Sequence, residues 1–337
     1  MFATLLGGLP RPEDPEGSSL DDDDGAVVVV LEAQATAGLE PLTDGRLRTR
    51  GFAGAVEGLE GMARGSEGPR LAGLPRWTQP LTVDAWRFAS GHAAGLVKQA
   101  LPGPYTLARR FGGSAGPGDD GADLAVAFAT ALRSEIRALA DAGCAFVEIE
   151  ERDAHLVGAD PGERRRFADA HRALLDGIDG IHVSLAIIGG NADTAGIETI
   201  LAAPYPSLAV DLIDGPDNWR LVRATPGDRG IVCGAMSSQA GSDDGPEVLL
   251  WAAAYAATSN NRGRDRVGIA TAAGLEGLSW AAAVRKMQRL GQAAGLGARS
   301  PAEIAAQLDP RAIDSRSAAL GRYDPPEQRP GRGPRRR

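Results

Sequence analysis

Blocks of apolar and polar residues alternate along this chain, and the blocks predict strands and helices in turn. Five short apolar runs are typical of strands, at 144–150, 180–188, 207–213, 230–236 and 266–274. Apolar residues recur at helical spacing at 123–143, 161–178, 197–203, 246–259 and 279–295. An earlier apolar run, 25–33, is followed by helical residues. Strands that alternate with helices predict a parallel sheet with crossover helices.

The spacing of the predicted strands, roughly 25 to 35 residues without a break in composition, favours a single closed (β/α)8 barrel. A doubly wound open sheet is the alternative fold. No predicted strand is followed directly by a G-x-G-x-x-G or P-loop motif that opens a helix, which counts against a nucleotide-binding sheet. We assign the barrel to residues 1–322 and expect disorder in the Pro/Arg-rich tail at 323–337 and in the acidic stretch 13–25.

The composition narrows the class of protein. Of 337 residues, 43% are hydrophobic and 24% charged, as is ordinary for a soluble globular protein. A net charge of -8 argues against nucleic acid and anionic membranes as partners. No apolar run approaches the ~20 residues of a membrane span. Cys144 and Cys233 lie in apolar stretches and predict reduced core residues in a cytoplasmic protein. This composition is compatible with a homo-oligomer.

Ionisable groups are densest in the stretch FVEIEERDAH. Alternation along a strand places Glu148 and Glu150 on one face, with Glu151 and Asp153 at the strand's end. Carboxylates at the carboxyl end of a barrel strand could orient an amine, bind a metal or act as acid and base. The alternative is a solvated loop with a salt bridge to Arg152. We favour a functional role for Glu150.

Two neighbouring predicted strands each carry one polar residue among apolar ones. Asp211 needs a partner there, and His182 on the preceding strand is the candidate. The pair predicts an acid–base dyad or half of a metal site, although a lone histidine in a strand is more often a core residue. A hard metal such as magnesium could instead use Asp211 and Glu150. Ser237 and Ser238 offer hydroxyls at another strand end, where serines usually form turns.

Several segments together resemble one family. LLGGLPRP resembles the motif I-G-S-x-P-R, LTDGRLR resembles T-D-G-E-x-R, and VKQALPGPYTL resembles V-K-x-x-L-T-G-P-x-T-L. FVEIEERDA resembles I-Q-I-D-E-P-A, HVSLAIIGGN resembles H-V-C-x-G-N, GIVCGAMSSQ resembles V-V-x-G-L-V-S-S-K, and VGIATAAGL stands where the family has L-S-P-x-C-G. These motifs, in this order, resemble the cobalamin-independent methionine synthases, within the superfamily shared with uroporphyrinogen decarboxylases. The resemblance implies a (β/α)8 barrel, here in its single-barrel form.

In that family a zinc ion binds the acceptor thiol and presents a thiolate to methyltetrahydrofolate. The resemblance places the histidine ligand at His182 and the glutamate ligand at Asp211. Ser184 and Ala273 stand in place of the two cysteine ligands. Zinc prefers thiolate and imidazole to a neutral hydroxyl. We therefore expect no tightly bound zinc.

The resemblance also implies an amino-acid pocket. Its serine, glutamate and aspartate correspond here to Gly8, Arg46 and Glu150. Because a guanidinium replaces a carboxylate, Arg46 would repel an amine and attract a carboxylate or phosphate.

The function expected from these residues is a diverged enzyme that acts on a small anionic substrate. It would transfer a methyl or related group without a thiolate-ligated zinc, and the resemblance makes methyltetrahydrofolate the candidate donor. His182, Asp211 and Glu150 would form the reacting centre. The substrate would contact the following residues: Arg46, Glu150, Ser184, Ser237 and Ser238. The alternatives are a metal-independent decarboxylase or lyase of the superfamily, and a non-catalytic barrel that binds a metabolite or a partner.

Overall fold

The computed structural model describes residues 1–13, 19–49, 51–65, 68–112, 120–242 and 245–299, and residue 303. The predicted tail at 323–337 lies outside the described residues, as do residues 14–18 of the predicted acidic loop.

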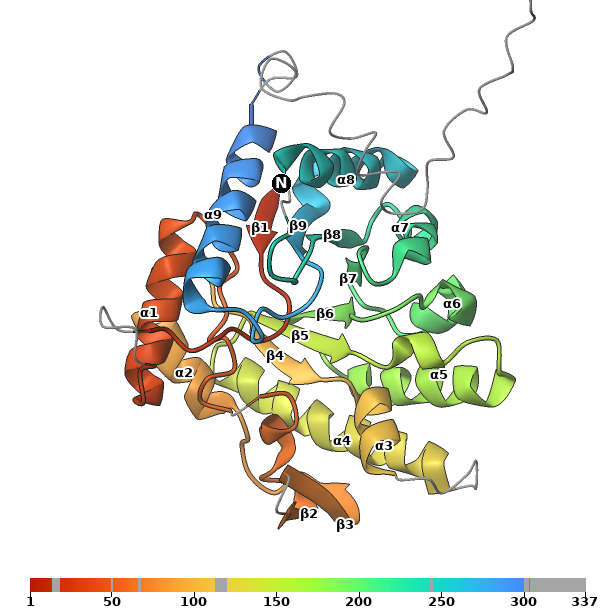
Figure 1. The fold of residues 1–337 in the computed structure, drawn as a ribbon. Helices are drawn as coiled ribbons and strands as arrows, with labels where there is room; N and C mark the ends of the chain where they lie inside the picture. Colours follow the sequence, from red (N-terminus) through yellow and green to blue (C-terminus); the bar gives the residue numbers. More distant parts are fainter. Residues whose placement is uncertain are drawn as a thin grey trace, which may run out of the picture.

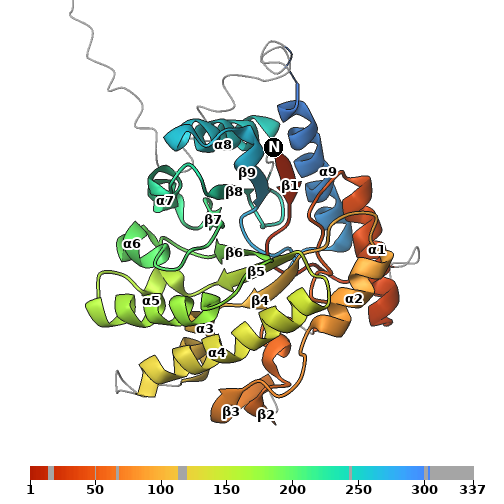
Figure 2. The same ribbon diagram turned by 180° about the vertical axis from the view of Figure 1, so that it is seen from behind.

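A curled parallel sheet forms the centre of the molecule, and helices lie around its outside (Figures 1 and 2). Its seven strands follow the order β1-β9-β8-β7-β6-β5-β4. Their bounds are β1 (Phe2–Thr4), β4 (Gln99–Pro102), β5 (Phe146–Glu151), β6 (His182–Ile187), β7 (Ser207–Asp211), β8 (Gly230–Met236) and β9 (Val267–Thr271). The five strands predicted from the apolar runs are all present.

The crossover helices also agree with the predicted alternation. Their bounds are α1 (Asp23–Thr36), α2 (Val83–His92), α3 (Pro104–Phe111), α4 (Asp120–Asp141), α5 (Pro161–Leu175), α6 (Ile197–Ile200), α7 (Trp219–Ala224), α8 (Pro246–Thr258) and α9 (Trp280–Gly297). Helix α4 is followed by Gly143 with φ of 97°, a backbone conformation that favours glycine after a helix. Proline opens α5 and α8, where its missing N–H costs nothing.

The sheet has seven strands among the described residues, rather than the eight predicted. Its two edge strands, β1 and β4, both meet the short segment 40–42. Glu40 N–H donates to the Ala3 carbonyl at 2.8 Å, and Leu42 N–H donates to the Leu96 carbonyl at 2.7 Å. Lys98 N–H in turn donates to the Leu42 carbonyl at 2.9 Å. Within the described residues, one parallel bridge, between Leu42 and Val97, is all the regular pairing that this segment makes.

The acidic stretch does not form a continuous loop. The Asp22 side chain accepts hydrogen bonds from the N–H groups of Asp24 and Gly25, and so caps α1. Asp23 and Asp24 occupy the first turn, where carboxylates interact favourably with the helix dipole. The prediction of an unstructured 13–25 is therefore wrong for residues 22–25, which begin a helix.

A two-stranded antiparallel hairpin, β2 (Glu60–Gly65) and β3 (Gly68–Arg76), lies outside the main sheet and contacts α4 (Figure 1). It was not predicted, because Pro69, Pro75 and several glycines are atypical of strands.

The inside of the curled sheet is filled mostly by small apolar side chains, and a second apolar core separates the sheet from its helices. One buried ion pair lies among these apolar side chains on the inside of the sheet. Lys98 Nζ donates to both oxygens of Glu148, at 2.9 and 2.8 Å, and to the Leu5 carbonyl at 2.7 Å. Cys144 and Cys233 are buried free thiols, as predicted. In the part of the chain that the structure describes, no helix is long and apolar enough to cross a membrane.

Candidate functional site

Glu150 occupies the carboxyl end of β5 and forms the centre of a charged cluster. Its side chain is fully buried and pairs with the guanidinium of Arg46. Arg152 Nε lies 3.4 Å from the same carboxylate oxygen, and Gly7 N–H donates to the other oxygen at 3.2 Å. Three segments that are distant in sequence therefore converge on this carboxylate. As predicted from strand alternation, Glu148 and Glu150 share the inward face, where their charges interact.

Arg46 reaches Glu150 from a tight turn that follows segment 40–42. Asp44 accepts a hydrogen bond from Arg46 N–H at 2.9 Å, and both Gly45 and Arg46 have positive φ, 67° and 62°. A non-glycine residue in the left-handed region carries strain of about 1–3 kcal/mol. The surrounding turn holds Arg46 in this conformation, and its side chain, 5% exposed, lies against the buried carboxylate.

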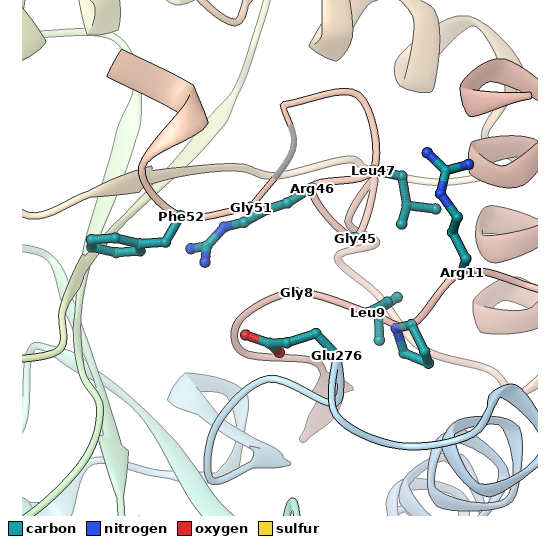
Figure 3. A pocket seen from close by; sticks show the side chains of 10 residues that line it. Gly8, Leu9, Arg11, Gly45, Arg46, Leu47, Gly51, Phe52 and Glu276 are labelled. Atoms are coloured by element: carbon teal, nitrogen blue, oxygen red, sulfur yellow. The ribbon is translucent and has the colours of Figure 1, made fainter. Parts of the chain in front are cut away.

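A cavity of about 360 Å³ opens beside this cluster. Gly8, Arg46, Phe52 and Glu276 line it, and the charged ends of Arg46 and Glu276 point toward the side where Phe52 lies (Figure 3). The Gly8 loop is held by Leu275, whose N–H donates to the Gly8 carbonyl at 2.8 Å. We call this space the carboxyl-end cavity.

Three arginines surround the Phe52 ring. The guanidinium carbons of Arg46, Arg110 and Arg152 lie 5.3, 4.9 and 4.9 Å from its centroid. Such contacts are worth about 0.5–1 kcal/mol each at exposed sites. Arg110 is neutralised by two 3.1 Å bonds to Asp153, whereas Arg46 and Arg152 share Glu150.

The arginines decide the ionisation of Glu150. Burial alone would raise its pKa, but Arg46 and Arg152 outweigh burial, and the pKa is lowered. For Glu148, burial outweighs the attraction of Lys98, and the pKa is raised. Glu150 is therefore a carboxylate at neutral pH.

The carboxylate of Asp211, the last residue of β7, accepts hydrogen bonds from three backbone N–H groups. One oxygen accepts from Gly189 N–H at 3.0 Å, and the other from Ile213 and Asp214 N–H at 2.8 and 3.0 Å. Burial nonetheless raises its pKa to about 6. These bonds fix the turns after β6 and β7.

The predicted pair of His182 and Asp211 is not formed. His182 is the first residue of β6, and Asp211 is the last residue of the neighbouring β7. Ser184 pairs with Ser207 in the parallel ladder, so His182 and Asp211 are separated by about 20 Å along the strands. His182 lies at the amino end of the sheet, where its Nε2 is 2.7 Å from Ser207 Oγ.

The motif H-V-C-x-G-N consequently takes a different alignment. Counted back from Gly190 and Asn191 at the end of the β6 turn, its histidine and cysteine positions fall on Ala186 and Ile188, both buried. Ser184 is a buried mid-strand residue whose Oγ donates to the Ser207 carbonyl at 3.5 Å.

The residues at these strand ends offer few side chains that could ligate zinc. The four positions are occupied by Ala186 on β6, Ile188 in the turn after it, Asp211 on β7 and Ala273 after β9. Of these side chains, Asp211 alone could ligate a metal. Across the described ranges, no three His, Cys, Asp or Glu side chains gather as a metal site.

Ser237 and Ser238 follow β8, also at the carboxyl ends. Ser237 is buried, and its Oγ accepts from Gln239 N–H at 3.1 Å, which is a turn-forming role. Ser238 is half-buried, and neither serine lines the carboxyl-end cavity.

Three residues near this site were not predicted: Phe52, Glu276 and His155. Arg152 was expected only as a salt-bridge partner of the acidic strand end, and it does pair with Glu150. The stretch FVEIEERDAH contains both Arg152 and His155, so charge density was the available signal for them. His155 packs against Gly190, and its buried Nδ1 has no hydrogen-bond partner among the described residues. Phe52 and Glu276 lie in loops far apart in sequence, and no local pattern joins them.

Comparison with known proteins gives a sequence match and several structural matches. A curated methionine synthase of Sulfurisphaera tokodaii is 26% identical over 209 residues, which cover 55% of this chain and 60% of that protein. The chain thus spans about 60% of the length of the curated relative that it matches. No family model matches the chain.

Solved structures share the fold. A B12-independent methionine synthase from Shewanella sp. W3-18-1, in complex with selenomethionine, superposes with a TM-score of 0.72 at 17% identity, covering 87% of this chain and 96% of that one. A methyltransferase from Methanosarcina mazei gives a TM-score of 0.56 at 14% identity, covering 86% and 92%. The chain is thus similar in sequence to a methionine synthase over about half of its length, and it shares the fold of a solved methionine synthase and of a solved methyltransferase.

Proposed function

We propose that the chain is a methyl-transfer-like enzyme that binds a small anionic substrate in the carboxyl-end cavity. The observation that carries this proposal is the convergence of Arg46 and Arg152 on one buried carboxylate, Glu150. Arg46 lines the cavity, so its guanidinium offers N–H donors there, while Glu150 and Glu276 balance the charges of Arg46 and Arg152. A planar guanidinium suits a carboxylate or phosphate, which it can bind through two parallel hydrogen bonds.

Glu150 has a positioning role in this proposal. It holds Arg46 and Arg152 at fixed places, so little conformational entropy is lost when a substrate binds. Glu276, 3.5 Å from Arg152 and 49% exposed, lies at the mouth and could accept a donor group of the same substrate. The strained backbone of Arg46 supports a functional reason for its place.

The methyl donor is part of the proposal. The relatives supply the reaction class, and methyltetrahydrofolate is the donor that the family resemblance implies. The proposed architecture is a ring of eight positions, in which segment 40–42 stands for the eighth strand between β1 and β4. The carboxyl-end cavity would then take the usual place of an active site in such barrels.

The alternative is a barrel that binds a metabolite without reacting. Apolar residues at Ala186, Ile188 and Ala273 favour it, since they stand at positions where the family has metal ligands. Both proposals predict ligand binding through Arg46, and turnover of a methyl donor separates them.

The test is a binding screen with small mono- and dicarboxylates, phosphate and methyltetrahydrofolate, read by calorimetry on the wild type and on Arg46→Gln. We expect the Arg46→Gln variant to weaken binding of the best acid by about tenfold or more, because a charged hydrogen bond is lost. Arg220→Gln, which changes an exposed arginine paired with Asp193, is the matched control. Equal affinities of wild type and Arg46→Gln would remove Arg46 from the site.

A further inference from the structure

A second cavity, of about 640 Å³, opens at the other end of the sheet. It is lined where the strands begin, by Phe2 of β1, His182 of β6, Ser207 of β7 and Ile231 of β8. We call it the amino-end cavity. Its volume falls within the range of about 300–1,000 Å³ that is usual for small-molecule sites. It shares no lining residue with the carboxyl-end cavity.

Aromatic rings form one wall of the amino-end cavity. The rings of Phe146 and His182 meet edge to face, with centroids 4.7 Å apart and an interplanar angle of 74°. The 2.7 Å contact between His182 Nε2 and Ser207 Oγ fixes the imidazole against this wall. Residue 182 is exposed overall, yet the partial burial of its ring lowers the pKa of His182, so the imidazole is neutral at pH 7. Phe2 supplies a further ring, and Ile231 an aliphatic surface.

The rim carries an excess of negative charge. Glu40, Asp228 and Asp265 supply three carboxylates, against the one guanidinium of Arg266. All four residues are exposed, so their side chains face solvent. An apolar aromatic wall below an acidic rim is complementary to a molecule with a flat apolar body and a positive end.

We propose that the amino-end cavity binds a small aromatic cation. The apolar body lies against Phe146, His182 and Phe2, and the ammonium lies at the rim between the carboxylates of Asp228 and Asp265. The negative charge of the rim favours the cation over an anion of the same shape. This site is independent of the proposed methyl-transfer function, because its residues come from the opposite end of the sheet.

The experiment titrates the full chain with tryptamine, and with the neutral indole-3-ethanol and the anionic indole-3-propionate as matched probes. Calorimetry gives the affinities, and NMR of the His182 imidazole gives the location. We expect tryptamine to bind about tenfold more tightly than indole-3-propionate at low ionic strength and to shift the His182 signals. In the double variant Asp228→Asn, Asp265→Asn the preference should fall to about twofold, while the affinity for indole-3-ethanol stays unchanged.

Four results would overturn the proposal. The first is no saturable binding of tryptamine up to about 5 mM. The second is a preference for tryptamine that survives in the Asp228→Asn, Asp265→Asn variant, because the rim would then not select charge. The third is binding that Arg46→Gln abolishes and that leaves His182 unshifted, which would place tryptamine in the carboxyl-end cavity. The fourth is dimerisation in the ultracentrifuge that tryptamine does not reverse and that the same double variant abolishes, which would make this face an interface between copies.

Discussion

The two ends of the sheet differ in the burial of their charged side chains. At the carboxyl ends, Glu150 is fully buried and Arg46 is 5% exposed, so the charges are removed from water and neutralise each other. At the amino ends, Asp228 and Asp265 stay exposed around an apolar interior. A buried charge whose partner is removed destabilises the fold, whereas an exposed charge can be changed at little cost. In the two proposed sites, the carboxyl ends would therefore combine stability and binding in the same residues, and the amino ends would separate them.

The largest loss of stability should come from the substitution Glu150→Gln. The substitution leaves Arg46 and Arg152 close together without the carboxylate that attracts both. We expect a loss of about 3 kcal/mol in the free energy of unfolding, the scale for removing one partner of a buried ion pair. Urea unfolding at neutral pH measures this loss.

The control for that change is Glu57→Gln, which removes the carboxylate of an ion pair whose arginine, Arg64, is 82% exposed. Its effect should stay below about 0.5 kcal/mol. If the two variants lose equal stability, the cluster around Glu150 is energetically no different from an exposed pair.

A second change in stability, of intermediate size, should come from the titration of Asp211 as the pH rises. Its pKa is raised from 3.8 to about 6 in the folded chain, because burial disfavours the carboxylate. The folded state therefore holds this proton more tightly than the unfolded state does. The stabilisation is complete below about pH 4 and is lost as the pH rises through about 6. About two pKa units correspond to roughly 3 kcal/mol at most.

Carboxyl ¹³C NMR of Asp211 measures the midpoint directly. Unfolding of the wild type and of Asp211→Asn at several pH values measures the energy. The stability of the wild type relative to the variant should decline between about pH 4 and pH 7. A constant difference, or a midpoint near 3.8, would show that the three N–H donors compensate fully for burial.

The smallest effect should come from His182→Ala at the amino ends. The change removes the contact with Ser207 Oγ and the edge-to-face contact with Phe146. We expect a loss of about 1 kcal/mol and an unchanged affinity for acids in the carboxyl-end cavity. Calorimetry on the folded variant checks the second point. If His182→Ala also weakens the binding of acids in the carboxyl-end cavity, His182 takes part in that site, and the two ends do not act independently.

Much of the fold was predictable because strands β5 to β9 and their helices have strong periodic patterns. The elements before residue 120 were harder. Strand β1 has three residues, and β4 has four, which include Gln99 and Pro102, so neither gives a clear alternation. The acidic residues before α1 look disordered by composition, and their role as a helix cap depends on the Asp22 side chain.

The candidate site was predictable where sequence position fixes a strand's end. Glu150 and Arg46 were paired by the family motifs, and the structure brings them together. His182 was misplaced because the run HVSLAII is apolar apart from His182 and Ser184, and such a run does not show at which end of the strand the site lies. Phe52 and Glu276 depend on tertiary folding, which brings the loops after segment 40–42 and β9 to the same cavity.

Segment 40–42 acts as a latch between β1 and β4. It borders the amino-end cavity, and the turn that follows it borders the carboxyl-end cavity. Glu40 lines the amino-end cavity, and Arg46, shortly after the latch, lines the carboxyl-end cavity. Backbone bonds at Glu40, Leu42 and Lys98, and the 2.7 Å bond from Thr4 Oγ1 to the Pro41 carbonyl, hold the latch. They lie outside the ladders of the seven-stranded sheet, so an opening of the latch would leave those ladders intact. Hydrogen exchange at the Leu42 and Lys98 amides therefore reports this opening. We expect a ligand that contacts Glu40 in the amino-end cavity to slow that exchange, so this pair of amides would report occupancy of that cavity.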